Sequence, residues 1–340
     1  MRRKSNVARF DRPAKVAILA GIVLASILAL QYLRPQLSAP THITLGITGA
    51  DWPIYVGVDA HIFEKYGLNV TIVNLGSGIN QMAALVAGQI QIGGELPSVI
   101  PAKLQGMDVV QVAAIEKARP FYLVAHPKIK SVEQLKGKIG GVYSVGSGLF
   151  YISTVIMLTK LGLDSEKDVT LVGISGGTAA MLAALQAGKI DFTLTSDPVK
   201  AEKLGLNVLL FQPDMVEGLP AGTGYATTSR YLRENREIVK KFIMSLTEGT
   251  KFFFENKNES KKILGKWLEV KDPETLEQQY KDWAKVALKI PKTNLDQVRA
   301  ILEALTPFEP KAVNADPKQF IDNSIVEELE SEGFFKLIWG

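Results

Sequence analysis

From residue 41 onward, short apolar runs alternate with amphipathic stretches that stop at a glycine. Thr41–Thr48 alternates apolar and polar positions, which predicts a strand with one buried face. Pro53 to Lys65 instead follows a helical period and stops at Gly67. The same pattern predicts further strands at Val70–Leu75, Ile90–Gly93, Val109–Ile115 and Tyr122–Ala125, and helices at Asn80–Ala87 and from Pro97 to Gly106. Strands that alternate with helices indicate an α/β fold with a mainly parallel sheet.

The alternation starts again after residue 137 and then gives way to helices. It predicts strands at Lys138–Val142, Val169–Val172, Ile190–Leu194 and Val208–Leu210, with helices at Ser147–Leu161, Thr178–Ala187 and Pro198–Lys203. From Ser229 onward the pattern predicts helices at about 229–255, 258–268, 273–288 and 294–305, followed by short turns to Gly340. The chain therefore ends in a helical region.

A nine-residue segment occurs twice, offset by 100 residues. Residues 84–92 (ALVAGQIQI) and 184–192 (ALQAGKIDF) share five identical positions, and each copy predicts a helix, a glycine stop and a buried strand. The repeat predicts two equivalent lobes, each a mainly parallel sheet flanked by helices. Lobe one would contain residues 41–125 and 225–340, and lobe two residues 126–224. Because ligands bind outside the carboxyl ends of strands in open parallel sheets, two such lobes predict an interlobe cleft.

The first 40 residues are typical of a targeting or anchoring segment. Residues 16–33 are uncharged and mostly apolar, and as a helix they would span about 27 Å, close to the roughly 30 Å of a bilayer core. The basic tail at 1–15 is expected in the cytoplasm, so the body after the linker at 34–40 is expected at the periplasmic or extracellular face. Two interpretations stay open, an uncleaved transmembrane anchor and a cleaved secretory signal. Pro40, just after the best cleavage position, favours the anchor.

Composition narrows the classes of function. The chain has no cysteine and three histidines, which excludes thiolate metal sites, iron–sulfur clusters and thiol nucleophiles. Residues 1–40 hold seven basic groups against one acid, and the remaining 32 basic and 34 acidic groups leave the body near neutral. This balance gives no support for nucleic-acid binding. The sequence shows no serine–histidine–aspartate arrangement and no cluster of metal ligands, so we expect neither an enzyme nor a cofactor.

Several motifs together resemble one family. They are Ile62–Leu68 (IFEKYGL), Ala87–Ile90 (AGQI), Ile129–Lys138 (IKSVEQLKGK) and Lys160–Leu163 (KLGL), and their order agrees from about residue 43 to 336. The combination is similar to the type 2 periplasmic solute-binding proteins of ABC importers, in the nitrate/sulfonate/taurine branch. The resemblance implies a monomer that closes on one small solute and delivers it to permease and ATPase subunits. A membrane-tethered ligand-sensing domain without transport is the alternative, because the same cleft would serve it.

Candidate binding residues lie in loops that follow strands or open helices. Glu95 follows the repeat strand of lobe one, where a carboxylate would favour a ligand with an amine or a ring N–H. The loop Ser144–Gly148 opens a long helix, and its glycines with Ser147 would form a cradle for an anion. Arg119 would pair with an anionic group, and Trp52 would stack on a planar ligand. The predicted ligand-binding residues are Trp52, Ser77, Glu95, Ser98, Arg119, Ser144, Gly146, Ser147, Thr178, Ser196 and Asp197.

Several of these positions have a purely structural alternative. Ser77, Ser196 and Asp197 are suited to capping the helix that follows each of them. Trp52 is equally suited to a core or surface position. Arg119 is as well suited to a solvated surface, and a Glu95 side chain turned toward its own helix would cap that helix.

Overall fold

The computed structural model describes residues 40–49, 51–146, 148–215 and 224–340. The basic tail (1–15), the apolar segment (16–33) and all of the linker (34–40) except Pro40 lie outside the described residues, and the membrane interpretation stays a prediction. Within the described ranges, no helix is long and apolar enough to cross a membrane. By its internal contacts the body from Thr41 to Gly340 is one unit.

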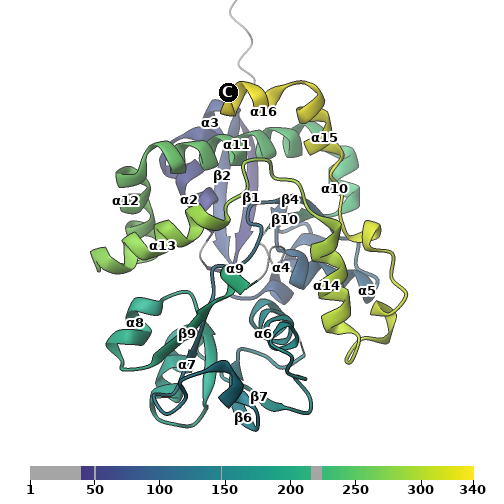
Figure 1. Cartoon of the computed structure of the whole chain (residues 1–340). Helices are drawn as coiled ribbons and strands as arrows, with labels where there is room; N and C mark the ends of the chain where they lie inside the picture. The colour runs from purple at the N-terminus through teal and green to yellow at the C-terminus, as the bar shows by residue number, and fades with distance from the viewer. Residues whose placement is uncertain (1–39, 50, 147, 216–223) are drawn as a thin grey trace, which may run out of the picture. The chain divides into compact units, whose positions relative to one another are not determined.

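Four parallel strands and one antiparallel strand form the first sheet, in the upper half of Figure 1. Its order is β2 (Leu68–Asn74), β1 (Thr41–Ile47), β3 (Ile92–Gly93), β10 (Gly224–Thr227) and β4 (Val110–Ala114), with β10 antiparallel to both of its neighbours. The helices between these strands are α2 (Trp52–Asp59), α3 (Ile62–Lys65), α4 (Gly78–Val86) and α5 (Leu96–Leu104). The sequence pattern does not predict β10, because a four-residue strand buried on both faces has no alternation to mark it.

The second sheet repeats this order. It runs β7 (Val169–Gly173), β6 (Lys138–Val142), β8 (Phe192–Thr195), β5 (Tyr122–Ala125) and β9 (Asn207–Phe211), with β5 antiparallel to its neighbours. The helical segments around it are η1 (Val132–Leu135), α6 (Gly148–Lys160), α7 (Gly177–Gln186), α8 (Pro198–Lys203) and α9 (Gln212–Met215). The two copies of the repeat fall at α4–β3 and α7–β8, the same place in each sheet. The prediction of two equivalent α/β lobes is confirmed.

Two boundaries differ from those expected. The strand Tyr122–Ala125, expected in lobe one, pairs with β8 and β9 in the second sheet. The first crossing between the sheets therefore lies between β4 and β5, before residue 122 rather than after 125. The single helix expected from Pro53 to Lys65 is two helices, because His61 adopts a left-handed φ of 54° at which an α-helix cannot continue.

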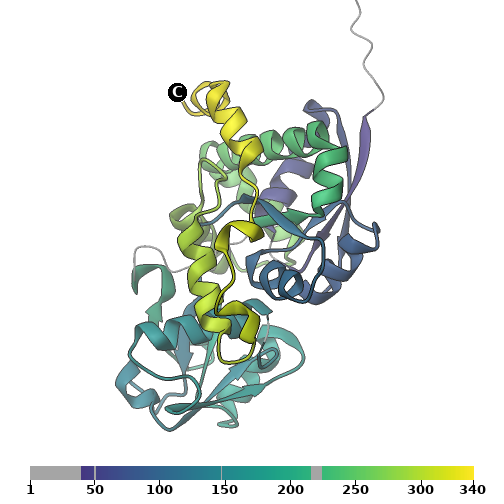
Figure 2. The same cartoon turned by 90° about the vertical axis from the view of Figure 1, so that its right-hand side faces the viewer.

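Helices make up most of the remaining chain. They are α10 (Ser229–Glu234), α11 (Arg236–Glu255), α12 (Lys257–Trp267), α13 (Pro273–Val286), α14 (Leu295–Leu305), η2 (Pro310–Ala312), η3 (Pro317–Phe320), α15 (Ser324–Ser331) and α16 (Phe334–Trp339). The helical C-terminal region is confirmed, but the helix expected at 229–255 is divided at Asn235. The short turns expected after residue 305 are wrong where α15 and α16 lie. Figure 2 shows this last segment, in yellow, running along one side of the body.

Each sheet has its own apolar core, and a further cluster joins the two lobes. Leu96 and Ile100 of α5 pack with Ile152 and Val155 of α6, a helix of the second lobe, and α14 joins the same cluster. Because Glu95 directly precedes α5, this contact lies beside the carboxyl end of β3. The carboxyl ends of the strands in the first sheet therefore lie next to an apolar contact between the lobes.

Candidate functional site

Three acidic residues gather at one edge of the first sheet. Asp51 follows β1, Glu95 follows β3 and Glu116 follows β4, and these parallel strands end at the same edge. The antiparallel β10 begins there and brings Tyr225, whose hydroxyl donates to Asp51 Oδ1 at 3.4 Å. All four side chains are buried. We call this group, Asp51, Glu95, Glu116 and Tyr225, the acidic edge.

Arg119 brings a positive charge to the acidic edge. Its Nη1 donates to Glu116 Oε2 at 3.1 Å, and its guanidinium carbon lies 5.4 Å from the centroid of the Phe121 ring. Trp52 donates its indole N–H to the other oxygen, Glu116 Oε1, at 3.0 Å. Glu116 is fully buried, yet it accepts from two donors, one of them charged. Removing either donor would take a hydrogen bond from a buried carboxyl oxygen.

Burial dominates the electrostatics of the other two acids. It raises the pKa of Glu95 to about 7, although Arg119 acts to lower that pKa. It raises the pKa of Asp51 to about 6, again against the attraction of Arg119. Burial alone would lower the pKa of Arg119, but the surrounding carboxylates, above all Glu116, outweigh it and raise that pKa. The acidic edge thus holds carboxyl groups that exchange a proton near neutral pH.

Two buried side chains at this edge have an acceptor that receives no hydrogen bond from the described residues. Glu95 occupies the N-cap position of α5 and is 7% exposed, but its side chain makes no cap hydrogen bond. Gln81 of α4 donates Nε2 to Gly46 O at 2.9 Å, whereas its Oε1 is buried without a donor. That oxygen lies 3.9 Å from the place that a Cβ on Gly94 would take, next to Glu95. The capping alternative for Glu95 is therefore not what the structure shows.

A row of rings connects Arg119 with the loops of the second lobe. The Phe150 ring lies 4.7 Å from the Phe121 ring and 4.0 Å from the Tyr143 ring, between centroids. The Tyr143 hydroxyl hydrogen-bonds Thr178 Oγ1 at 2.6 Å. Burial raises the pKa of Tyr143, and Arg119 is among the groups that oppose this rise, which places Arg119 within electrostatic reach of it. The structure thus brings Thr178, a predicted site residue, to the side of the second lobe that faces the acidic edge.

Other predicted site residues lie at the starts of helices, and two of them cap a helix. Ser77 caps α4 and Asp197 caps α8, each accepting the backbone N–H three residues on, at 3.3 and 2.9 Å. Ser98 is buried against the first turn of α4, since a Cβ on Gly78 would stand 1.8 Å from its hydroxyl oxygen. Ser196 follows β8 and is half-buried. For Ser77 and Asp197 the capping role is present in the structure, and contact with a ligand stays a prediction.

The predicted anion loop is described in part. Ser147 lies outside the described residues. Ser144 is exposed, and Gly146 and Gly148 have φ angles of 82° and 79°, which glycine adopts without strain. These residues lead into α6, a 13-residue helix with no acidic residue in its first turn. The described part of the loop therefore keeps the features that favour an anion.

Two expectations about single side chains need correction. The Trp52 ring is fully buried, 4.3 Å from the Phe253 ring between centroids, and its N–H is used by Glu116. It supports a carboxylate and has no free face for a planar ligand. Arg119 is not a solvated surface residue, because 11% of its side chain is exposed and it pairs with Glu116.

Sequence reasoning missed Asp51, Glu116 and Tyr225. A signal for the two acids was present, since each comes within a few residues of the end of a strand in the same sheet, as Glu95 does. Tyr225 had no such signal, because it depends on β10, more than a hundred residues away from β3.

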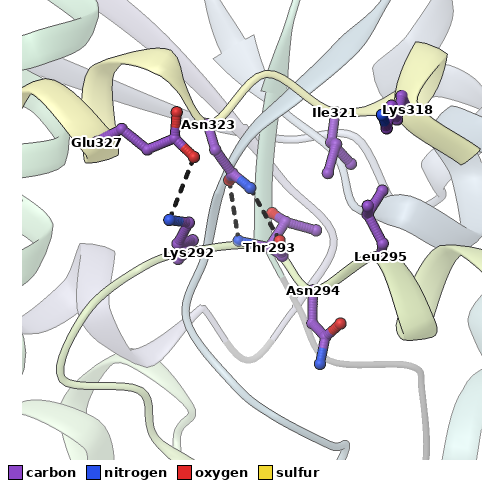
Figure 3. A pocket seen from close by; sticks show the side chains of 8 residues that line it. All are labelled: Lys292, Thr293, Asn294, Leu295, Lys318, Ile321, Asn323 and Glu327. Carbon is purple, nitrogen blue, oxygen red and sulfur yellow. Dashed lines mark hydrogen bonds and ion pairs between the residues drawn. The ribbon is translucent and has the colours of Figure 1, made fainter.

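Two pockets lie elsewhere on the body. One of about 600 Å³ is lined by Lys292, Thr293, Asn294, Leu295, Lys318, Ile321, Asn323 and Glu327 (Figure 3). Asn323 closes one wall through two hydrogen bonds with the Thr293 backbone, at 3.0 and 2.9 Å, and Lys292 pairs with Glu327 at 3.2 Å. A second pocket of about 290 Å³ is lined by Asp197, Lys200, Lys203, Val270, Lys271, Asp272 and Thr275. Within the described ranges, no group of three or more histidines and acids could hold a metal ion.

Three of the solved structures with the same fold are solute-binding proteins by name. The alkanesulfonate-binding protein SsuA from Xanthomonas axonopodis pv. citri, bound to MOPS, has a TM-score of 0.68 at 18% identity, covering 84% of this chain and 99% of its own. The aliphatic sulphonate binding protein SsuA from Escherichia coli has a TM-score of 0.68 at 20% identity, covering 83% and 92%. The nitrate-binding protein NrtA from Synechocystis PCC 6803 has a TM-score of 0.66 at 13% identity, covering 86% and 89%. At these identities the likeness shows the two-lobed periplasmic-binding-protein fold.

A sequence profile identifies the family. No curated protein matches this chain closely enough to count as a relative. Residues 51–260, more than half of the chain, match the profile described as NMT1/THI5 like. This match and the structural neighbours confirm the resemblance to the nitrate/sulfonate/taurine branch of binding proteins. The chain belongs to the NMT1/THI5-like family.

Proposed function

We propose that this protein is the extracytoplasmic solute-binding component of an ABC importer. Its solute would be a small anionic or zwitterionic molecule, of the sulfonate, nitrate, taurine-like or heterocyclic kind, held between the two lobes. The observation that carries the proposal is the acidic edge with Arg119, a buried and charged group at the carboxyl ends of β1, β3 and β4. Family membership and the shared fold support it.

The two lobes would contribute different chemistry to this solute. The first lobe supplies carboxyl groups and Arg119. The second supplies the Ser144–Gly148 loop, the start of α6 and the hydroxyls of Tyr143 and Thr178. Backbone N–H groups at a helix start favour a negative charge. A solute between them would meet carboxyl groups and Arg119 on one side, and backbone N–H groups and hydroxyls on the other.

The location and partners follow from the same proposal. A protein of this kind works outside the cytoplasmic membrane, and residues 16–33 would keep it there as an uncleaved anchor, with the basic tail inside. Permease and ATPase subunits would receive the solute. The intact mass of the protein recovered from cells tests the anchor: we expect the full chain, and a mature chain that starts near Thr41 would refute it.

Calorimetry on the full chain, purified in a mild detergent, tests the binding function. The panel contains nitrate, alkanesulfonates, amino acids and pyrimidines. We expect saturable binding of at least one class with one site per chain. Uptake of the same compound by cells should disappear when the gene is deleted and return with the unaltered gene. Binding without any loss of uptake would contradict the transport role, and absence of binding across the panel and across a cell-extract metabolite fraction would contradict the binding role.

A further inference from the structure

Glu95 of the acidic edge and the neighbouring Gln81 each have an acceptor that no donor among the described residues satisfies. Among the described residues, Trp52 and Arg119 donate to Glu116, and Tyr225 donates to Asp51. The carboxyl group of Glu95 and Oε1 of Gln81 are left without a donor. Buried polar atoms in folded proteins nearly always have a partner, and each one left without it costs roughly 1–3 kcal/mol. The buried Gln81 oxygen lies next to Gly94, the residue before Glu95, so both acceptors together indicate a donor that the described residues do not supply.

We propose that the solute carries a nitrogen that donates hydrogen bonds, as a protonated amine or a ring N–H, and that Glu95 and Gln81 bind it. This inference rests on the proposed solute-binding function and names the group that the first lobe selects. An ammonium group supplies three donors and a ring N–H supplies one, whereas nitrate and simple sulfonates supply none. A pure anion would place its oxygens against the ionised carboxylate of Glu95 and leave both acceptors unsatisfied.

The position of Glu95 suits selection by charge. It precedes α5, whose Leu96 and Ile100 pack in an apolar cluster with α6 of the second lobe, and Glu95 is itself 7% exposed, so a solute nitrogen would meet it in largely buried surroundings. Hydrogen bonds between charged groups are stronger there than in water. Arg119 donates its Nη1 to Glu116 and acts on Glu95 through its charge, which lowers the pKa of Glu95 and favours the carboxylate that would bind a cation.

The protonation of Glu95 then couples solute binding to pH. Burial raises the pKa of Glu95 to about 7, so the carboxylate that attracts a cation is present in increasing amount as the pH rises through 7. Three charged groups act on Glu95: Asp51 after β1, and Glu116 and Arg119 after β4. Tyr55 of α2 and Tyr225 of β10 lie within reach of Asp51, and Tyr143 after β6 lies within reach of Arg119. Asp51, with a pKa of about 6, acts in the same direction as Glu95.

Matched pairs of solutes, with and without the nitrogen, test the inference on the full chain in detergent. The pairs are 2-aminoethanesulfonate with ethanesulfonate, and 4-aminopyrimidine with 4-methylpyrimidine, and nitrate is added alone. A second arm identifies by native mass spectrometry the small molecules retained from a cell-extract metabolite fraction. We expect the amine-bearing member to bind at least 10-fold more tightly, and the retained molecule to carry an amine or ring N–H. We also expect the affinity of the protein for the amine-bearing solute to rise about 10-fold between pH 5.5 and 7.5.

The variant Glu95→Gln assigns the effect to this residue. It should weaken binding of the nitrogen-bearing solute roughly 10- to 100-fold, the usual worth of a hydrogen bond between charged groups. Glu303→Gln, on the exposed face of α14, is the matched control and should bind as the unaltered chain does. Circular dichroism confirms that each variant is folded, and the pH series on the unaltered chain is a readout that does not depend on a variant.

Several results would overturn the inference while leaving the proposed function intact. They are tight binding of nitrate or ethanesulfonate that is insensitive to Glu95→Gln, a retained molecule without any N–H group, and binding of Mg²⁺, Ca²⁺ or Zn²⁺ alone that Glu95→Gln abolishes. If the unaltered chain binds no probe and retains no small molecule, the proposed function fails, and this inference fails with it.

Discussion

Replacing Glu95 by glutamine should make the solute-free protein more stable at alkaline pH. Glu95 is 7% exposed, and burial raises its pKa from an ordinary value of 4.5 to about 7. The folded state therefore keeps the proton of Glu95 over a range in which the unfolded chain has lost it. Stability from this group is fully present below about pH 4.5 and is lost as the pH rises through 7, because the folded state must then ionise a buried carboxyl. Glutamine cannot ionise and escapes this loss.

The size of the effect follows from the two pKa values. The rise from 4.5 to about 7 corresponds to about 3 kcal/mol, at roughly 1.36 kcal/mol per pH unit. The free energy of unfolding of Glu95→Gln should therefore exceed that of the unaltered chain by about 3 kcal/mol at pH 8. At pH 4.5 the two should be nearly equal, since the protonated glutamate and the glutamine are similar in shape and charge.

Urea unfolding at pH 4.5, 6 and 8 measures the difference without added solute. Fluorescence reports on the folded body, because all four tryptophans, Trp52, Trp267, Trp283 and Trp339, lie in it. The exposed control Glu303→Gln should follow the unaltered chain at each pH. A difference between Glu95→Gln and the unaltered chain that stays constant from pH 4.5 to 8, or a less stable variant at pH 8, would show that the carboxyl is not held in its neutral form by burial.

Three further substitutions test other parts of the site. Trp52→Phe removes the indole N–H that donates to the buried Glu116 and should lower the free energy of unfolding, measured in urea, by about 1–3 kcal/mol. An unchanged free energy of unfolding would show that this hydrogen bond does not stabilise the fold. Ile152→Ala, in the apolar contact between α5 and α6, should cost about 2–5 kcal/mol, against less than about 0.5 kcal/mol for the exposed Ile79→Ala. Gly146→Val forces a branched side chain to a φ of 82° and should weaken binding of the anionic end of the solute; unchanged affinity in calorimetry would remove this loop from the site.

The strength of local signals decided how much of the fold could be predicted. Each helix–glycine–strand unit, and each copy of the repeat at 84–92 and 184–192, consists of contiguous residues, so the sequence alone predicts the two equivalent sheets. Strand β10 and helices α15 and α16 are short, and β10 acquires its place from pairing with β3 and β4 rather than from its own four residues. The same limit explains why the lobe boundary near β5 was misplaced: β5 pairs with β8 and β9, which come much later in the chain, and its own four residues do not specify these partners.

The candidate site was predictable to the extent that strand ends define it. Glu95 was found by this rule, and the rule applies equally to Asp51 and Glu116. Which donor reaches which carboxyl could not be predicted, because it depends on packing between distant segments. Trp52, 64 residues before Glu116 in the chain, proved to be its donor and not a platform for a ligand.

Stability and affinity should change in opposite directions at Glu95, and that opposition distinguishes a binding residue from a structural one. A structural carboxylate stabilises its own fold, so its replacement by glutamine costs stability at the pH where it is charged. Glu95 has no donor among the described residues and a pKa of about 7, so its ionisation costs the empty protein stability. A solute nitrogen would supply the missing donor, and the hydrogen bond it makes to the ionised Glu95 would contribute to the affinity for the solute. A residue that weakens the empty fold in this way is expected where function rather than folding has determined its identity.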